Sequence, residues 1–408
     1  MKRIFISLLA LFAFAHLAFM FAASWNSRGC DFSFRYHEMQ CVVKEGIDPY
    51  LIWSGDLRHA RYCPFDSKEE GKHSVHTYPP WAYTFLYPFS LLSFDAACKI
   101  FNLLNVIAAL FVISIAGTLG YRLQKSLWDT LFVAACAALF GGYALRGVLA
   151  GQNFGLLFAA LLILMAMALK KKKRWSDIMA GSILALVMMK THIGIFIVIP
   201  LLMGRRILTL TTGALLCILA ATITAMQCDT SPVTMILQTA QAGKPYINWT
   251  PMMPESALTT LSPWIEPNVL INVSGLLGIF ICIVLSWRNR FAESWLHKFT
   301  PPIICATMFY YSQVHDNTLY CIPLILLAIT MLVQQSQKEK IFAAALIFLL
   351  CSSFLMYTGS IFGRESTIYA TSFTLYCLAN WVTVVGMCIW LYRKPVLFKR
   401  SPEHSYFL

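Results

Sequence analysis

Charged residues are scarce in this chain of 408 residues. Asp, Glu, Lys and Arg together make up 12% of the sequence, whereas hydrophobic residues make up 58%. Soluble domains usually carry about 25% charged residues, so the composition indicates an integral membrane protein surrounded by membrane lipids. Length alone would suggest two or three soluble domains. Because apolar runs follow one another along the whole chain, we instead expect residues 1–408 to form a single membrane domain.

Several sequence motifs for binding nucleotides and metals are also missing. The chain contains neither an Asp-x-Asp motif for a nucleotide sugar nor a glycine-rich P-loop, which argues against a nucleotide-linked substrate. The histidines of the first polar segment (His37, His59, His73 and His76) match no usual spacing of metal ligands. We therefore expect no metal and no cofactor. The chain also has no convincing internal repeat and no low-complexity tract.

The excess of basic residues, a net charge of +13, does not indicate nucleic-acid binding. The basic residues lie in short clusters between apolar runs, as in the cytoplasmic loops of membrane proteins. These clusters are Lys2-Arg3, Arg122/Lys125, Lys170–Arg174, Arg205-Arg206, Arg288/Arg290/Lys298, Lys338/Lys340 and Arg393–Arg400. All of them fall on the cytoplasmic side if the short, proline-containing run 79–94 does not cross the membrane. If it does cross, the five cations 170–174 lie outside, so we expect 79–94 to be re-entrant or interfacial.

The apolar runs predict the number of membrane crossings. A transmembrane helix needs about 20 apolar residues, although about 17 can suffice. The candidate spans are 4–24, 96–119, 128–145, 153–169, 177–190, 193–203, 207–226, 269–287, 299–314, 318–333, 341–358 and 372–392. They predict an all-α bundle of about 12 transmembrane helices, in the plasma membrane and with both termini in the cytoplasm. We read the first run as an uncleaved helix, while Ala22-Ala23-Ser24 leaves signal-peptide cleavage open.

Two long polar segments then fall on the extracytoplasmic side. Residues 25–77 form the first outer loop, which we expect to be structured, and residues 227–268 form the second. Cys30, Cys41 and Cys63 lie in the first loop and Cys228 in the second. Disulfides are possible if the compartment is oxidising, but the sequence does not define which cysteines pair.

Two ionisable residues on this side are candidates for chemistry. Asp31 follows the first helix directly and is either a solvated or capping carboxylate or a general base whose pKa is raised by partial burial. Lys190 interrupts an apolar stretch at the outer ends of two short runs. It either extends its ammonium group to the interface or binds an anion, with phosphate as the obvious candidate.

Other polar residues share this side of the membrane. His192 interrupts the same apolar stretch as Lys190 and is a further candidate for the anion site. His315 and Asp316 either form a polar turn, or His315 orients Asp31 or binds an anionic group. Gln152 and Asn153 either cap the next helix or bind anions or sugar hydroxyls. Tyr78 and Trp81 either belong to an interfacial aromatic belt or contact a sugar or lipid, and Arg146 lies on the same side. Together they predict one polar site at the extracytoplasmic face.

The order of these motifs resembles that of a known family. The pattern of the polyprenol-phosphate-mannose-dependent alpha-mannosyltransferases is similar to this order: Asp31, Tyr36, Gly46-Ile47-Asp48-Pro49-Tyr50, Thr77-Tyr78-Pro79-Pro80, Gly151-Gln152-Asn153, Lys190-Thr191-His192, Gly204-Arg205-Arg206 and His315-Asp316. These enzymes belong to the C-type (GT-C) integral-membrane glycosyltransferases. The resemblance covers about residues 1–210 and then His315-Asp316.

The resemblance implies a GT-C-type bundle, a sugar donor linked to polyprenyl phosphate, Asp31 as the base and His315 as its partner. Lys190, Arg146 or a histidine could hold the leaving phosphate as its charge develops. We therefore predict an inverting, metal-independent hexosyltransferase that moves a hexose, with mannose favoured, to a lipid-linked or periplasmic glycan acceptor. A secondary transporter with broken helices and a lipid-linked-glycan ligase or polymerase remain as alternatives.

Overall fold

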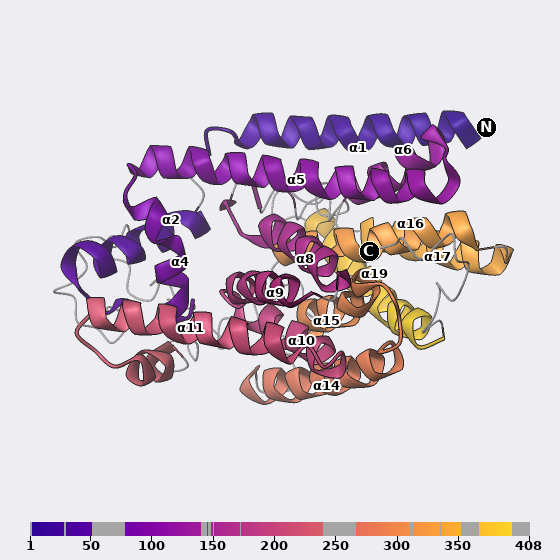
Figure 1. Ribbon diagram of the computed structural model, residues 1–408. Coiled ribbons are helices and arrows are strands. Elements are labelled where there is room, and N and C mark those ends of the chain that lie inside the picture. The colour runs from indigo at the N-terminus through magenta and orange to yellow at the C-terminus, as the bar shows by residue number, and fades with distance from the viewer. Residues whose placement is uncertain are drawn as a thin grey trace.

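The computed structural model describes residues 2–27, 30–50, 78–139, 145, 148–149, 151–171, 173–239, 267–309, 314–334, 336–351 and 367–393. Within these ranges every regular element is a helix, and the helices pack into a bundle (Figure 1). The all-α class predicted from the sequence is therefore confirmed for the part of the chain that the structure describes.

Twelve of the described helices correspond in order to the twelve apolar runs. They are α1 (Lys2–Ser24), α5 (Phe94–Gln124), α6 (Leu127–Ala138), α8 (Gly155–Lys170), α9 (Arg174–Val187), α10 (Thr191–Met203), α11 (Ile207–Gln227), α14 (Pro267–Arg288), α15 (Trp295–Phe309), α16 (Cys321–Val333), α17 (Gln337–Leu350) and α19 (Thr367–Arg393). By length and composition, 5 described helices qualify to cross a membrane: Lys2–Ser24, Phe94–Leu123, Ile207–Gln227, Asp316–Val333 and Thr374–Arg393. The full count of crossings stays a prediction.

The described part of the first outer loop contains short helices. Residues 30–45 form α2 (Cys30–Gln40) and the π-helical turn η1 (Cys41–Glu45), while residues 51–77 lie outside the described part. The following helix, α4 (Pro80–Ser90), has 11 residues. At about 1.5 Å per residue it is too short for a hydrocarbon core of about 30 Å. Helix α10, one of the predicted crossings, has only 13 residues, so length does not test whether 79–94 crosses and its re-entrant or interfacial character stays a prediction.

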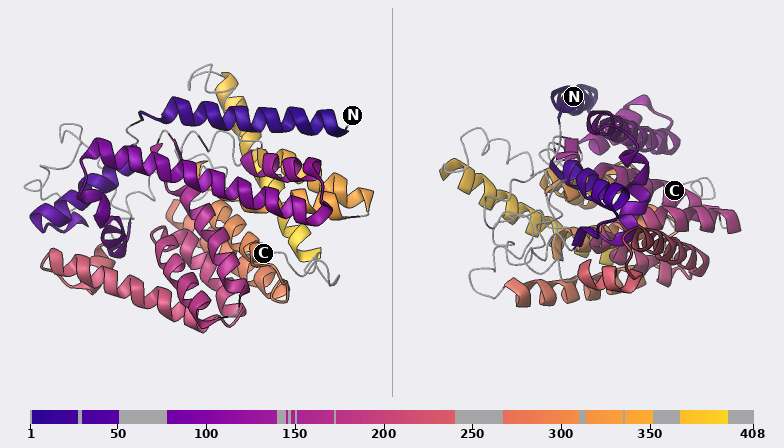
Figure 2. Two further views of the ribbon diagram at one scale, coloured as in Figure 1. Left: turned by 45° about the horizontal axis from the view of Figure 1, so that its top comes forward. Right: turned by 90° about the vertical axis from the view of Figure 1, so that its left-hand side faces the viewer.

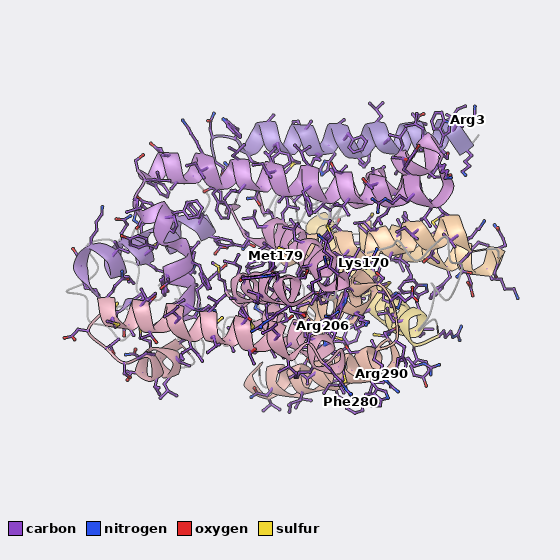
Figure 3. The ribbon with its side chains drawn as sticks, in the orientation of Figure 1. Arg3, Lys170, Met179, Arg206, Phe280 and Arg290 are labelled. Atoms are coloured by element: carbon purple, nitrogen blue, oxygen red, sulfur yellow. The ribbon has the colours of Figure 1, made fainter. Side chains whose placement is uncertain are left out.

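Polar contacts join the ends of helices that the charge pattern places together. The contacts at the basic ends are Lys2 to Asp129 (3.4 Å), Arg206 to the Leu169 carbonyl (2.6 Å) and Arg288 to the Tyr392 carbonyl (3.3 Å). Figure 3 labels four residues of the basic clusters: Arg3, Lys170, Arg206 and Arg290. A further contact lies in the first part of α5, away from its basic end. There the Asn102 amide donates to the carbonyls of Ser24 (3.3 Å) and Trp25 (3.2 Å), which fixes the end of α1 beside α5.

The bundle has a buried centre and an apolar outer surface. Helix α8 is apolar on all sides up to its terminal Lys170, and most of its residues are buried, as expected for a central helix. Helix α1 lies at the edge of the bundle beside α5 (Figure 2) and exposes Ile4, Leu8, Leu11 and Phe19. An apolar surface of this extent needs a cover, and the acyl chains of a bilayer provide one.

Candidate functional site

Helix α2 brings three charged residues onto one of its faces. Asp31, Arg35 and Glu38 are separated by four and three residues, the spacing at which side chains of an α-helix are neighbours. Arg35 Nη1 lies 2.6 and 2.8 Å from the two carboxylate oxygens of Glu38. Its Nε lies 3.9 Å from Asp31 Oδ1. The guanidinium group is therefore held by Glu38 and turned toward Asp31.

Helix α4 fixes the other side of this group. The Tyr83 hydroxyl donates to Glu38 Oε2 at 3.1 Å, and the Arg35 guanidinium lies 4.4 Å from the centre of the Tyr78 ring, just before α4. Arg35 and Glu38 are both almost fully buried. Separating the two side chains would leave an uncompensated buried charge, which is strongly unfavourable. The pair is therefore expected to stay together and to give Asp31 a rigid support.

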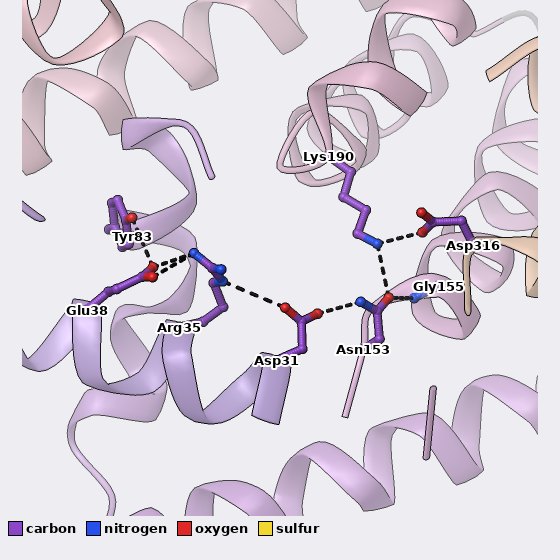
Figure 4. A network of polar contacts seen from close by, with 8 residues as sticks. All are labelled: Asp31, Arg35, Glu38, Tyr83, Asn153, Gly155, Lys190 and Asp316. Carbon is purple, nitrogen blue, oxygen red and sulfur yellow. Dashed lines mark hydrogen bonds and ion pairs between the residues drawn. The ribbon is translucent and has the colours of Figure 1, made fainter. Parts of the chain in front are cut away.

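Asn153 connects Asp31 to the rest of the bundle. It lies in the turn that leads into α8, and its Nδ2 donates a hydrogen bond to Asp31 Oδ2. Its Oδ1 accepts from the Gly155 N–H at 3.0 Å and from Lys190 Nζ at 3.1 Å (Figure 4). These contacts use the amide nitrogen and oxygen for opposite partners, so Asn153 bridges the carboxylate of Asp31 and the ammonium of Lys190.

A buried ion pair lies at the other end of this bridge. Lys190 Nζ is 2.5 Å from Asp316 Oδ1, and the two side chains are only 7% and 2% exposed. Asp316 belongs to the 3₁₀ helix η4 (Val314–Tyr320), and its second oxygen lies 3.7 Å from His192 Nε2 at the start of α10. The network thus extends from α2 through the entry of α8 to η4.

Lys190 lies in the closely packed turn between α9 and α10. A Cβ on Gly194 would clash with Met188 Sδ and lie 3.0 Å from Met188 Cα, so a larger residue there would force this turn to shift. Trp81 Nε1 donates to the Met188 carbonyl at 3.1 Å and ties the turn to α4. Trp81, predicted to contact a sugar or lipid, is therefore also a structural tie.

Asp31 is the member of the network that combines burial with access. Its side chain is 23% exposed, against 2% for Asp316. Burial raises the pKa of Asp31 above its ordinary value, although the positive charges of Arg35 and Lys190 oppose this shift. A raised carboxyl pKa favours proton uptake during a reaction, so the environment of Asp31 suits a base that must accept a proton.

Five of the residues selected from the sequence thus lie in one network: Asp31, Asn153, Lys190, His192 and Asp316. Gln152 is directed elsewhere, because its Nε2 donates to the Cys98 carbonyl at 3.1 Å. Arg146 and the side chain of His315 lie outside the described residues. The chemical roles of all these residues stay predictions.

The sequence interpretation missed Arg35 and Glu38. The spacing of Asp31, Arg35 and Glu38 was a usable signal, provided that residues 30–40 had been recognised as a helix. Of the outer-loop cysteines, Cys41 and Cys228 are buried, whereas the side chain of Cys30 and all of Cys63 lie outside the described residues, so the possible disulfides stay a prediction. Among described residues, no group of three His, Cys, Asp or Glu side chains could hold a metal ion.

Comparisons with known proteins place this geometry in context. The model of glycosyltransferase family 87 matches residues 76–353, more than half of the chain. The matched range includes Asn153, Lys190 and Asp316, whereas Asp31 precedes it. The search of curated proteins gave no match, and the search of solved structures gave none either.

Proposed function

Because this chain belongs to glycosyltransferase family 87, we propose that it moves a hexose, with mannose favoured, from a polyprenyl-phosphate donor to a lipid-linked or periplasmic glycan acceptor. The observation that supports this most is the convergence of Asp31, Asn153, Lys190 and Asp316 from separate elements into one network. Ionisable residues buried inside a membrane protein are costly and usually mark function. Here they combine a carboxylate that can take up a proton with a buried cation.

Asp31 acts as the base in the proposed reaction. The acceptor hydroxyl gives its proton to the Asp31 carboxylate while its oxygen forms a bond to the anomeric carbon of the donor sugar. The bond between that carbon and the phosphate oxygen breaks, and the electron pair leaves with polyprenyl phosphate. One displacement inverts the anomeric carbon and needs no second carboxylate as a nucleophile.

Lys190 would stabilise the leaving phosphate. A positive charge placed where negative charge develops lowers the barrier of such a transfer. The ammonium group is held by Asp316 and by Asn153, and Asn153 also holds Asp31. The cation and the base therefore keep a fixed separation. His192, His315 and Arg146 are proposed as further contacts to the donor, with His315 as the partner of Asp31.

The donor class can be tested with purified protein and a membrane-lipid extract as acceptor. Labelled polyprenyl-phosphate mannose, glucose and arabinose would be compared with the corresponding nucleotide sugars, with and without EDTA. We expect transfer from a polyprenyl-phosphate sugar that persists in EDTA. Transfer only from nucleotide sugars would contradict the proposed donor. No transfer from any donor, together with sugar uptake into proteoliposomes, would indicate a transporter.

The pH dependence of transfer should report the state of Asp31. The base is active when ionised, and burial raises its pKa, so activity should fall as the pH drops through a midpoint above the ordinary carboxyl value of about 3.9. Initial rates measured from acid to neutral pH, after correction for unfolding, would show this limb. A profile whose acid midpoint lies at or below the ordinary value would contradict the assignment.

A hydrogen bond that holds η4 in place offers a second test of the proposed site. Asn317 Nδ2 donates to the Tyr376 hydroxyl at 2.6 Å, which ties the helix that carries Asp316 to α19. Tyr376→Phe removes this partner and leaves the ring, so we expect transfer to fall by about 5- to 10-fold, consistent with the loss of one buried hydrogen bond. Tyr392→Phe, on the exposed end of α19, is the matched control and should leave transfer unchanged. Equal rates for the two variants would exclude this positioning role.

A further inference from the structure

The hydroxyl of Tyr78 is enclosed but lacks a hydrogen-bond partner among the described residues. The residue is 5% exposed, and no described residue accepts from or donates to its phenol oxygen. Most buried polar side-chain atoms have at least one partner, and a buried donor without one destabilises the fold. An exception of this kind calls for a reason, and a ligand that supplies the missing partner is one.

The position of the Tyr78 ring is fixed by its surroundings. The Arg35 guanidinium lies 4.4 Å from the ring centre, and the Phe154 ring lies 6.0 Å away, measured between centroids. The Tyr78 carbonyl accepts from the Tyr50 hydroxyl at 2.6 Å. Because the backbone and both the cation and the aromatic neighbour hold the ring, the phenol cannot simply turn toward another partner inside the protein.

The surroundings of this hydroxyl connect it to the proposed active site. Burial raises the pKa of the Tyr78 phenol most, and the negative charge of Asp31 raises it next. The positive charge of Arg35 lowers this pKa, and Asp316 raises it. Tyr78 therefore belongs electrostatically to the network that runs from Arg35 to Asp316. The geometry gives the same link: the Arg35 guanidinium lies 4.4 Å from the centre of the Tyr78 ring and its Nε lies 3.9 Å from Asp31 Oδ1, so the ring and the carboxylate are neighbours of the same cation.

The charges of the network indicate which substrate group fits there. Asp31, Glu38 and Asp316 face Arg35 and Lys190, so ionised carboxylates outnumber the cations of Arg and Lys. A phosphate next to Asp31 would be repelled. A sugar hydroxyl is neutral, and it can accept a hydrogen bond from a phenol while it donates one to a carboxylate.

On this basis, and resting on the proposed function, we propose that the Tyr78 hydroxyl donates a hydrogen bond to a ring hydroxyl of the sugar being transferred. Tyr78 would then be a specificity-determining residue. A site that is built to bond a substrate hydroxyl discriminates strongly against analogues that lack it, because the protein group is left without a partner. The phosphate would lie on the Lys190 side of the network.

Tyr78→Phe tests this directly, because it removes only the unpartnered hydroxyl and keeps the ring under Arg35. We expect kcat/KM for the donor to fall by about 10-fold while the melting temperature stays at or above that of the wild type. Tyr36→Phe is the matched control: its hydroxyl donates to the Leu92 carbonyl at 2.7 Å, so that variant should lose thermal stability and retain transfer. Unchanged kcat/KM in Tyr78→Phe, or a melting temperature lowered as in Tyr36→Phe, would overturn the inference.

Two further measurements separate the sugar from the phosphate. Polyprenyl phosphate without a sugar should inhibit the wild type and Tyr78→Phe equally; weaker inhibition of the variant would assign the hydroxyl to the phosphate. In a series of monodeoxy donors, one should be transferred equally by both proteins, and retention of the full difference with every donor would contradict a sugar contact. Absence of transfer by the wild type would instead refute the proposed function itself.

Discussion

Replacing Asp31 with Asn is expected to reduce sugar transfer by about 10³-fold, within the range that general-base catalysis contributes. The asparagine has nearly the same shape, and its carbonyl oxygen can still accept from the Asn153 amide that now bonds to Asp31. What the variant loses is the ability to accept the proton of the acceptor hydroxyl. The measurement is the initial rate of transfer from the polyprenyl-phosphate donor at a pH where Asp31 is ionised.

A control for this variant should remove the same charge outside the network. Asp229 suits this purpose, because it is exposed near the end of α11 and has a left-handed backbone with φ of 48°. Asparagine tolerates that conformation well, so Asp229→Asn should fold and transfer sugar as the wild type does. An Asp31→Asn protein that keeps more than a tenth of the wild-type rate would contradict the assignment of Asp31 as the base.

Substitution of Lys190 by Met should affect both stability and transfer. It leaves Asp316, whose side chain is 2% exposed, without its principal cation. Breaking a buried ion pair in this way typically costs about 3–5 kcal/mol. The same change removes the charge that we propose stabilises the leaving phosphate, so transfer should also be lost. Thermal unfolding and transfer rates on the same preparation measure the two effects.

The double variant Lys190→Met, Asp316→Asn separates these effects. It removes the unpaired charge, and replacing both partners of a buried pair is often close to neutral, so most of the stability should return. Transfer should remain at least about 10²-fold below the wild type, in keeping with the loss of one electrostatic contact to the reacting group. A stable double variant with wild-type transfer would restrict Lys190 and Asp316 to a structural role.

The apolar runs predicted the helices well because membrane burial depends on local composition. The predicted runs 4–24 and 207–226 correspond to α1 and α11, and the ends of each helix differ from the prediction by at most two residues. Helices such as α10, with 13 residues, are too short to establish a crossing by length. Whether they cross depends on tilt and on neighbouring helices, which composition alone does not define.

The site was partly predictable for a different reason. The distribution of basic clusters predicted one face for Asp31 and Lys190, and the structure links both residues through Asn153. The same reasoning could not separate Gln152 from Asn153, because the direction of adjacent side chains depends on the backbone turn. Gln152 adopts φ of 53°, and its amide bonds to α5 while that of Asn153 reaches Asp31. To predict that Arg35 supports Asp31, one would have to know which side chains of α2 share a face.

The central claim is a single displacement in which Asp31 activates the acceptor, and the anomeric configuration of the product tests it most directly. Purified protein would transfer sugar from a polyprenyl-phosphate donor of known configuration, and proton NMR of the isolated product would identify the new linkage. Inversion relative to the donor is the predicted result. Retention of configuration would contradict the account, because it requires a covalent intermediate or an equivalent second displacement.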